Sequence, residues 1–349
     1  MTAAEPKYTH GEVDRAGDIL IRDSTGIEDE KQSALEVLDY WRAAHNSPMN
    51  TFQATLRHRL TVIHRKALVA QRLKRTPAIL EKLRRFPTMH LSEIQDIGGL
   101  RAVVGNVVDV RALYEDYKNN NRLQHVIAKE KNYIDIPKSD GYRGVHLVYK
   151  YVNPKAPEYE GLLLEIQMRT NLQHAWATTV ETMGTLLRYS LKSDEGPEKW
   201  RRFFALTGSA FAHLEGSPPV PGYESMSATD TFREVARQSQ ALKVKETLTS
   251  LPVAMEPISR FKNKGSWFLL MLDPDGKRMT LQPFGKDRFA QATDMYLRLE
   301  ESALGTHKQV VLVSTASVMQ LKRAYPNFFL NTDKFIQILR DIEQRAGAS

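Results

Sequence analysis

The order of apolar segments between residues 100 and 188 is the feature that most constrains the fold of this chain. Short apolar and β-branched runs, typical of strands, alternate with longer segments of helical periodicity. The strand-like runs are 100–104, 126–131, 145–152 and 161–168, and the helical segments are 109–119 and 171–188. Because some strands are joined by a helix and others by turns alone, this order predicts an α/β (α+β) fold in which helices flank a mixed sheet.

The segments before this core are mostly helical in pattern. Residues 1–30 are polar and irregular, whereas 31–50 and 51–70 carry apolar side chains at helical spacing. A short helix is predicted over 79–86, with Thr76 as its N-cap and a proline in its first turn.

A change of composition after residue 213 indicates a boundary. The segment 214–227 holds three prolines, two glycines and three serines, which is the composition of a linker. A connecting helix is predicted over 229–249, and a second unit begins near Pro257. Within that unit, the Asp-Pro-Asp-Gly sequence at 273–276 separates two strand-like runs and predicts a hairpin turn.

These boundaries predict four regions. An N-terminal helical segment (1–50) precedes the principal α/β domain (51–215), and a linker with its helix (216–256) leads to a C-terminal α/β domain (257–349). The elements predicted for the last domain are strands 267–272, 278–284 and 309–314, and helices 287–302, 317–325 and 332–344.

The composition favours a reducing compartment. The chain contains no Cys, which excludes disulfides, thiol nucleophiles and Cys-ligated metal sites. The first twenty residues lack the apolar run of a signal peptide, and no stretch approaches the roughly 18 apolar residues needed to span a bilayer. We therefore expect a cytoplasmic protein with no membrane partner, and a monomer, because no coiled-coil pattern is present.

The chain is basic, with a net charge of +8, which predicts phosphate-rich partners such as nucleotides or nucleic acid. Between Arg57 and Arg85 there are ten Lys or Arg residues and a single acid, Glu81. Apolar residues are interleaved with these cations, so we expect an apolar face that packs on the core and an open basic face. The alternative is an ordinary solvated helix face.

Several common nucleotide-binding and hydrolytic signatures are missing. No Gly-x-x-x-x-Gly-Lys-Ser/Thr sequence occurs, no Gly-x-Gly-x-x-Gly follows a strand-like run, and none of the ten His is followed by Asp. A nucleotide enzyme with this sequence therefore uses another scaffold.

Two carboxylates are candidates for holding a divalent cation. Asp96 precedes a strand-like run and Glu165 lies within one, and neighbouring strands can direct two acids to one ion. Phosphoryl-group transfer needs such an ion, and Mg²⁺ usually takes one or two carboxylates. Glu165 also interrupts an apolar run, where an unpaired carboxylate is costly. For either acid taken alone, a surface acid or an ion-pair partner is the alternative.

Further polar residues surround these acids. Gln167 and Arg169 alternate with apolar residues, so they share one strand face with Glu165 and indicate a polar cleft. Tyr142 follows a glycine and can offer its ring to a nucleobase. The loop cations Lys138 and Arg143 are candidates for binding phosphates, and His146 opens the next strand-like run. The alternatives are a half-buried loop tyrosine, solvated loop charges and a core histidine.

Four segments stand out together, at 72–75, 96–101, 138–146 and 165–170 (RLKR, DIGGLR, KSDGYRGVH and EIQMRT). In this order and spacing they resemble the RelA/SpoT alarmone synthetase family, especially its small single-domain synthetases, over about residues 57–188. The resemblance implies a nucleotidyltransferase-like mixed sheet. It also implies transfer of pyrophosphate from ATP to a ribose hydroxyl, with Mg²⁺ as cofactor.

The resemblance assigns a role to each matching residue. It implies that Asp96 and Glu165 are catalytic and hold Mg²⁺, with Glu165 also a candidate general base. The implied ATP-binding residues are Arg72, Lys74, Arg75 and Arg101, of which the first and last sandwich the adenine. The implied acceptor-binding residues are Lys138, Tyr142, Arg143, His146, Gln167 and Arg169, with the tyrosine stacked on the acceptor base.

A second, shorter resemblance concerns the C-terminal part. Residues 324–329 (AYPNFF) are similar to the Tyr-Pro-Asn-Tyr segment of the CapRel proteins, fused toxin–antitoxin members of the superfamily that act in phage defence. The resemblance implies a small zinc-finger-like domain without metal, whose aromatic residues block the ATP site. Tyr325 matches the first tyrosine, whereas Phe328 replaces the second, so this autoinhibitory lock lacks one hydroxyl.

Together the resemblances imply a toxic pyrophosphokinase that modifies the 3′-CCA end of tRNA and so blocks translation. Its C-terminal domain inhibits it, and a phage protein, such as the major capsid protein, activates it and causes abortive infection. One alternative is a small alarmone synthetase that makes (p)ppGpp or (p)ppApp. Another, of a different class, is an inactive RNA-binding or phage-sensing module; the presence of both Asp96 and Glu165 argues against it.

Overall fold

The structure of the chain is a computed structural model. It describes residues 7–22, 28–64, 66–119, 123–187, 189, 191, 196–249, 254–255, 267–303, 305–315 and 317–347. Pro257, where we place the start of the second unit, and Arg65 of the basic run lie outside these residues.

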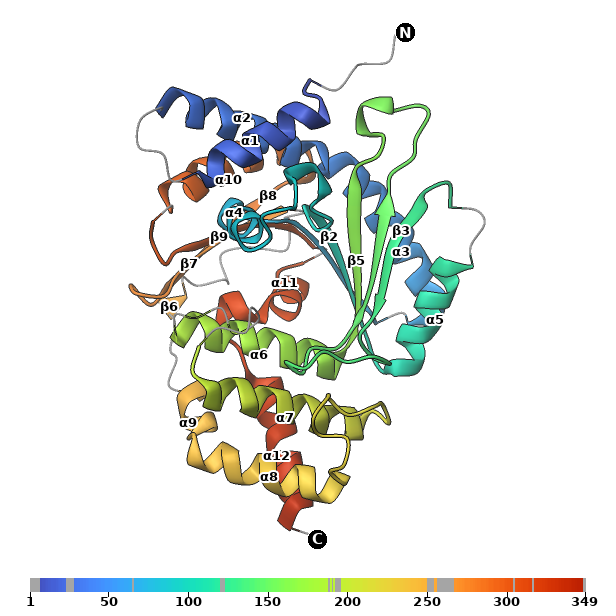
Figure 1. The fold of residues 1–349 in the computed structure, drawn as a ribbon, viewed down its shortest axis with the longest axis vertical. Helices are drawn as coiled ribbons and strands as arrows, with labels where there is room; N and C mark the ends of the chain where they lie inside the picture. The colour runs from blue at the N-terminus through green and yellow to red at the C-terminus, as the bar shows by residue number, and fades with distance from the viewer. Residues whose placement is uncertain are drawn as a thin grey trace.

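Nine strands of the described residues form one mixed sheet in the order β3-β4-β5-β2-β1-β9-β7-β8-β6 (Figure 1). The strands are β1 (Leu68–Leu73), β2 (Gly98–Val104), β3 (Val126–Asn132), β4 (Val145–Lys150), β5 (Leu163–Thr170), β6 (Ala254–Met255), β7 (Trp267–Asp273), β8 (Arg278–Phe284) and β9 (Gln309–Ser314). β2 and β5 are parallel, as are β6 and β8, and the other neighbours are antiparallel. The predicted α/β class with a mixed, helix-flanked sheet is confirmed, whereas the zinc-finger-like character of the C-terminal part stays a prediction.

Helices cover this sheet on both faces and extend below it in Figure 1. They are α1 (His10–Ile21), α2 (Glu28–Ala44), α3 (Asn46–Ile63), α4 (Thr76–Arg85), α5 (Val107–Lys118), α6 (Asn171–Leu187), α7 (Glu198–Leu214), α8 (Ala228–Ala241), α9 (Val244–Thr249), α10 (Phe289–Ser302), α11 (Val318–Ala324) and α12 (Asp333–Gly347). A short 3₁₀ turn, η6 (Pro326–Phe329), links α11 to α12. None of the described helices has the length and apolar character needed to cross a bilayer.

The alternation of β5 divides its side chains between two environments. Leu164, Ile166 and Met168 are fully buried in the core that α3 and α5 share with the sheet. The residues between them, which include Glu165 and Gln167, point to the opposite face, because successive side chains of a strand alternate. That second face is covered by α6 and α11, and it carries the polar residues of the candidate site.

The C-terminal strands continue the sheet of the preceding region. β9 pairs with β1, so that Ser314 lies opposite Gln71 and Val313 lies opposite Arg72. The last helix, α12, packs against α6 and α8 in an apolar cluster that includes Phe335. How the chain divides into domains stays a prediction, but hydrogen bonds of one sheet cross the predicted boundary.

Two predictions about the N-terminal third are wrong. Residues 10–21 are not irregular: they form α1, which begins with a capping box between Thr9 and Glu12. The helix predicted over 51–70 ends at Ile63, and Leu68–Leu73 form β1 instead. A short apolar run has no decisive periodicity, and here the pairing of β1 with strands on both sides makes it a strand.

Smaller differences concern helix ends. The predicted helix over 31–50 is divided, since α2 ends at Ala44 and α3 begins at Asn46. The N-cap of α4 is Arg75 rather than Thr76, which is the first helical residue, although the proline does lie in the first turn as predicted. We did not predict α7, which follows a segment that is only partly described.

The basic run does not form one open face. Its residues are divided among α3, β1 and α4, because β1 interrupts the expected helical pattern. Arg59 of α3 forms an ion pair with Asp116, and Lys74 and Lys82 both pair with Asp96. The expectation of a continuous basic surface over 57–85 is therefore corrected.

Candidate active site

Asp96 and Glu165 lie near the start of two neighbouring parallel strands. In the register of β2 with β5, Gly99 lies beside Glu165, and Asp96 stands two residues before Gly98, the first residue of β2. The negative charge of Asp96 acts on the carboxyl of Glu165. The two acids are therefore brought together at one end of the polar face.

Two lysines hold the carboxylate of Asp96. Lys74, directly after β1, places Nζ 2.6 Å from Oδ2, and Lys82 of α4 places Nζ 2.8 Å from Oδ1. Burial raises the pKa of Asp96, but the two ammonium groups outweigh this effect and hold the pKa below its usual range. Asp96 is one-quarter exposed (25%), so an incoming ligand can reach it.

Hydrogen bonds hold the carboxylate of Glu165. His146 Nδ1 lies 2.7 Å from Oε1, and Gln167 Nε2 donates to Oε2 at 2.7 Å. Burial raises the pKa of Glu165, as does the charge of Asp96, but His146 and Gln167 outweigh both and bring the pKa down to about 2. Glu165 is therefore ionised at neutral pH, although it is largely buried.

These bonds belong to a closed ring of five side chains. Tyr142 Oη lies 2.5 Å from His146 Nε2, and Arg169 donates to Tyr142 Oη through Nη2 at 2.7 Å and Nε at 3.1 Å. Arg169 Nη2 also donates to Gln167 Oε1 at 2.9 Å, which closes the ring at Glu165. In this ring Glu165 accepts on both carboxylate oxygens, and the hydroxyl of Tyr142 accepts from Arg169.

Tyr142 is enclosed by this arrangement. Its side chain is 8% exposed, and its ring meets those of Tyr133, His146 and Trp176 edge-on at centroid distances of 5.8, 5.5 and 6.4 Å. The ammonium group of Lys138 lies 5.4 Å from the same ring. Stacking of Tyr142 on an acceptor base stays a prediction, and it requires some of these neighbours to move.

Arg143 does not join the ring. Its guanidinium is buried and donates to the carbonyl of Ile134 at 3.2 Å and to that of Pro218. Burial lowers the pKa of Arg143 to about 10. The loop packs closely on α7 through Gly141, whose φ is +94° and where a Cβ atom would lie 2.8 Å from the carbonyl oxygen of Phe204. Arg143 thus anchors the loop that carries Tyr142.

The predicted adenine-binding pair, Arg72 and Arg101, lies near Tyr325. Arg101 donates to the carbonyl of Ala324 at 2.9 Å, and its guanidinium lies 5.4 Å from the centre of the Tyr325 ring. Burial lowers the pKa of Arg101 to about 10, and the charge of Arg72 contributes in the same direction. Tyr325 is 2% exposed and packs edge-on against Phe328 at 6.4 Å.

The four predicted ATP ligands therefore have different surroundings. Arg72 and Arg101 both act electrostatically on Tyr325, whereas Lys74 binds Asp96. Burial lowers the pKa of Arg75, the N-cap residue of α4, and the positive charge of Arg72 lowers it further.

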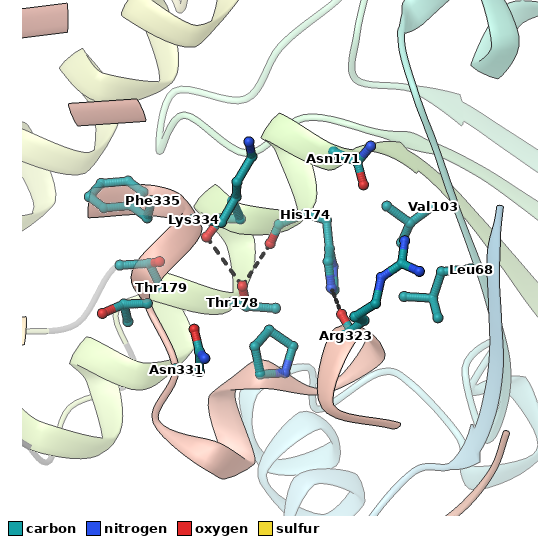
Figure 2. Close-up of a pocket in the computed structure, with 13 residues that line it drawn as sticks. Leu68, Val103, Asn171, His174, Thr178, Thr179, Arg323, Asn331, Lys334 and Phe335 are labelled. Carbon is teal, nitrogen blue, oxygen red and sulfur yellow. Dashed lines mark hydrogen bonds between the residues drawn. The ribbon is translucent and has the colours of Figure 1, made fainter. Parts of the chain in front are cut away.

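A cavity of about 250 Å³ lies between α6 and the segment 323–335 (Figure 2). Its lining residues are Leu68, Val103, Asn171, His174, Ala175, Thr178, Thr179, Arg323, Pro326, Asn331, Thr332, Lys334 and Phe335. His174 Nε2 lies 2.8 Å from the carbonyl oxygen of Arg323, as the dashed line in Figure 2 shows. Burial and the charges of Arg101 and Arg169 lower the pKa of His174 to about 3, so its neutral ring tethers the end of α11.

The sequence reasoning missed Lys82 and His174. Lys82 lies in the basic run, but we gave it no role. The usable signal was its position three residues after the buried Ile79, which places Lys82 at the border of the buried face of α4. His174 lies four residues after Thr170 at the start of α6, and nothing local indicates its contact with residue 323.

Comparison with known proteins identifies the middle of the chain. Residues 71–190 match the family model described as the region found in RelA / SpoT proteins. These residues are therefore similar to the region shared by RelA / SpoT proteins. All four segments that carry the predicted site residues lie within the matched residues.

Two relatives of the RelA/SpoT region come from Bacillus subtilis (strain 168). The chain is 35% identical over 112 residues to GTP pyrophosphokinase YjbM, covering 32% of this chain and 52% of that protein. It is 32% identical over 112 residues to GTP pyrophosphokinase YwaC, covering 31% of this chain and 52% of that protein. The chain thus spans about half the length of the curated relatives it matches.

A solved structure similar to this chain is that of the small alarmone synthetase 1 from Bacillus subtilis bound to its product pppGpp. It is 26% identical, with a TM-score of 0.42, and the match covers 50% of this chain and 93% of that one.

Proposed function

We propose that this chain is an ATP-dependent pyrophosphokinase, which transfers the β,γ-pyrophosphate of ATP to a ribose hydroxyl. The observation that carries the proposal is the pair of ionised carboxylates, Asp96 and Glu165, at one end of a polar sheet face. The RelA/SpoT region and the two relatives named GTP pyrophosphokinase support the same reaction.

The donor set fits Mg²⁺. Mg²⁺ usually takes one or two protein carboxylates and completes its shell with phosphate oxygens and water. Across the described part of the chain, no cluster of three or more His, Asp or Glu side chains offers a larger site. We therefore propose that Asp96 and Glu165 hold Mg²⁺, which, when bound, neutralises the charge on the phosphate oxygens.

The residues around the two acids provide the remaining functions. Lys74 and Lys82 are one-quarter exposed or less and hold Asp96 in this structure, so they are placed to move onto the phosphates when ATP arrives. In the transfer, the acceptor oxygen forms a bond to the β-phosphorus, the bond from that phosphorus to the α,β-bridging oxygen breaks, and AMP leaves. The acceptor proton passes to the ionised carboxylate of Glu165, the candidate general base, and from there to solvent.

For the acceptor we propose the 3′-terminal adenosine of tRNA, whose modification would make the enzyme a toxin. The net charge of +8 supports a polyanionic partner. The second candidate is a guanosine or adenosine nucleotide, and the relatives named GTP pyrophosphokinase favour it.

The deciding experiment incubates the full chain with γ-labelled ATP and, in turn, with tRNA, GDP, GTP or excess ATP. We expect label on tRNA, and its removal by trimming the 3′-adenosine. Label on nucleotides alone identifies an alarmone synthetase instead. Asp96→Ala and Glu165→Ala are the controls, since toxicity that survives in both favours an inactive RNA-binding or phage-sensing module.

We further propose that Tyr325 inhibits the enzyme until a phage protein displaces it. Tyr325 is buried against Arg101, and the carbonyls on its N-terminal side are tethered by Arg101 and His174. Such a trigger can act only by binding the open state more tightly than the closed one.

Tyr325→Ala tests this lock. We expect it to increase ATP-dependent transfer and growth inhibition without a phage protein, whereas Tyr189→Ala, at an exposed tyrosine, should change neither. Equal activity of the Tyr325→Ala variant and the unaltered chain would contradict autoinhibition.

A further inference from the structure

Arg42 is a buried cation that takes no part in the ring around Glu165. It lies near the end of α2 and is 1% exposed. Its Nε donates to the carbonyl of Lys74 at 3.1 Å, and its Nη1 donates to Thr76 Oγ1 at 2.8 Å. A buried guanidinium persists only when its charge and its donors are satisfied, so these contacts must be maintained in the folded chain.

The charge of Arg42 is balanced mainly by α10. Glu300 Oε2 lies 2.9 Å from Arg42 Nη1, and Tyr296 of the same helix places its hydroxyl 2.5 Å from Arg42 Nη2. Asp39 is a further partner at 3.1 Å, but its carboxylate is one-third exposed (33%). Glu300 is itself buried, so it is the dehydrated anion of this pair.

Glu300 also binds the start of α4. Its Oε1 accepts from the backbone nitrogen of Thr76 at 2.9 Å, and the Thr76 hydroxyl donates to Oε2 at 3.2 Å. The first amides of a helix have no partner within the helix, and a carboxylate at that end satisfies them and interacts favourably with the helix dipole. The N-terminus of α4 is thus capped by a residue 224 positions later in the chain.

Arg42 and Glu300 bind the backbone of residues 74 and 76, and this part of the chain carries the two lysines that bind Asp96. Lys74 is the residue whose carbonyl accepts from Arg42, and Lys82 lies in the helix that Glu300 caps. Both lysines bind Asp96. Any shift of residues 74–76 therefore moves the cations that are proposed to receive the ATP phosphates.

We propose that Arg42 and Glu300 are positioning residues, a latch through which α10 fixes residues 74–76 and thereby Lys74 and Lys82. This inference rests on the proposed function, since it assigns the lysines to ATP. It means that the C-terminal part both covers the site, through Tyr325, and supports it, through Glu300. Release from inhibition then involves α11 and η6 moving while α10 stays in place.

A consequence is that deletion and point substitution should differ. Removing the C-terminal part takes away Tyr325, but it also takes away Glu300 and the strand β9 that pairs with β1. We expect the shortened chain to be inactive, whereas Tyr325→Ala in the full chain is active.

The test uses Glu300→Gln in the full chain with Tyr325→Ala, so that transfer is measurable. We expect the KM for ATP to rise about tenfold while kcat changes less than threefold, because the lysines are displaced but the carboxylates of Asp96 and Glu165 stay. The matched control is Glu301→Gln, at the exposed neighbouring acid on the same helix, which should change neither constant.

A second variant separates positioning from stability. The pair Arg42→Met with Glu300→Leu replaces the ion pair by apolar side chains, which often preserves stability. We expect its thermal unfolding to return toward that of the parent while the KM for ATP stays raised, since Lys74 has lost its backbone donor. A KM that recovers together with the melting temperature would reduce the pair to a structural role.

Amide hydrogen exchange tests the latch without catalysis. In the Glu300→Gln variant the amide of Thr76 should exchange at least about tenfold faster, and it should be unchanged in Glu301→Gln. If no acceptor is ever labelled but Thr76 exchanges faster, the latch stands and the proposed function has failed. Unchanged exchange and an unchanged KM together would overturn the latch.

Discussion

The two acids of the candidate site are both ionised, but they are held in different ways. Asp96 is bound by two flexible ammonium groups that come from a loop and a helix, and it is one-quarter exposed (25%). Glu165 is bound within a ring of hydrogen bonds whose members come from two paired strands and one loop. The comparison suggests a division of labour: the partners of Asp96 can transfer to a substrate, whereas the partners of Glu165 keep it in position.

The largest expected effect removes either acid. Asp96→Asn and Glu165→Gln should each lower pyrophosphate transfer at least about a hundredfold, because each removes a charge proposed to hold Mg²⁺. The measurement is label transfer from ATP in the Tyr325→Ala chain. If one acid proves dispensable while the other is essential, the two acids do not hold Mg²⁺ together.

Lowering the pH should remove the contribution that the hydrogen-bonded carboxylate of Glu165 makes to the stability of the protein. The pKa of Glu165 is depressed from its ordinary 4.5 to about 2. The contribution of Glu165 to the unfolding free energy is therefore fully present above pH 4.5 and is lost as pH falls toward 2. We expect Glu165→Gln to cost about 2–3 kcal/mol of unfolding free energy at pH 7, and the difference from the unaltered chain to shrink below pH 4.5. Urea titrations at several pH values would show it. A difference that stays constant down to pH 2.5 would contradict the assigned pKa.

Breaking the ring at its tyrosine should have an intermediate effect. Tyr142→Phe leaves Arg169 and His146 without a shared hydroxyl, which should cost about 1–3 kcal/mol of stability. We expect transfer to fall about tenfold, because Glu165 loses part of its orientation. Tyr133→Phe leaves the ring intact and serves as the control. Equal losses in both variants would mean that packing, not the hydroxyl, is responsible.

The smallest effect concerns the lysines. Lys82→Met leaves Lys74 on Asp96, so the unfolding free energy should change by less than about 1 kcal/mol, as for a partly exposed ion pair. The KM for ATP should nevertheless rise about tenfold, and moderate salt should reproduce part of that increase by screening the charges. If stability falls instead and KM does not move, Lys82 is a structural partner of Asp96 rather than a phosphate ligand.

Much of the polar face could be predicted because strand geometry is local. Side chains in a strand alternate, so the sequence alone put Glu165, Gln167 and Arg169 on one face, and the structure joins all three in one ring. The hairpin at 273–276 was likewise readable from its proline and glycine, and β7 and β8 pair around it, although Lys277 and not Gly276 has the positive φ.

The roles of the cations could not be read in the same way. Lys138, Arg143 and Lys82 look alike as charges in the sequence, yet Lys138 lies near aromatic rings, Arg143 binds two backbone carbonyls and Lys82 pairs with Asp96. A long cationic side chain binds whatever acceptor the fold brings near it, and its sequence neighbours do not specify that acceptor.

By itself the sequence determined the alternation of its strands, its turns and the similarity of its central residues to RelA/SpoT proteins, because these depend on near neighbours and on short motifs. Only the tertiary structure decided that residues 68–73 form a strand, that Tyr325 lies against Arg101, and that Glu300 caps α4. Each of these outcomes depends on partners at least 25 residues away, and each has a partner more than 200 residues away. Burial and hydrogen bonding between such distant segments exist only once the whole chain has folded, so they outweigh local preference without leaving a local signal.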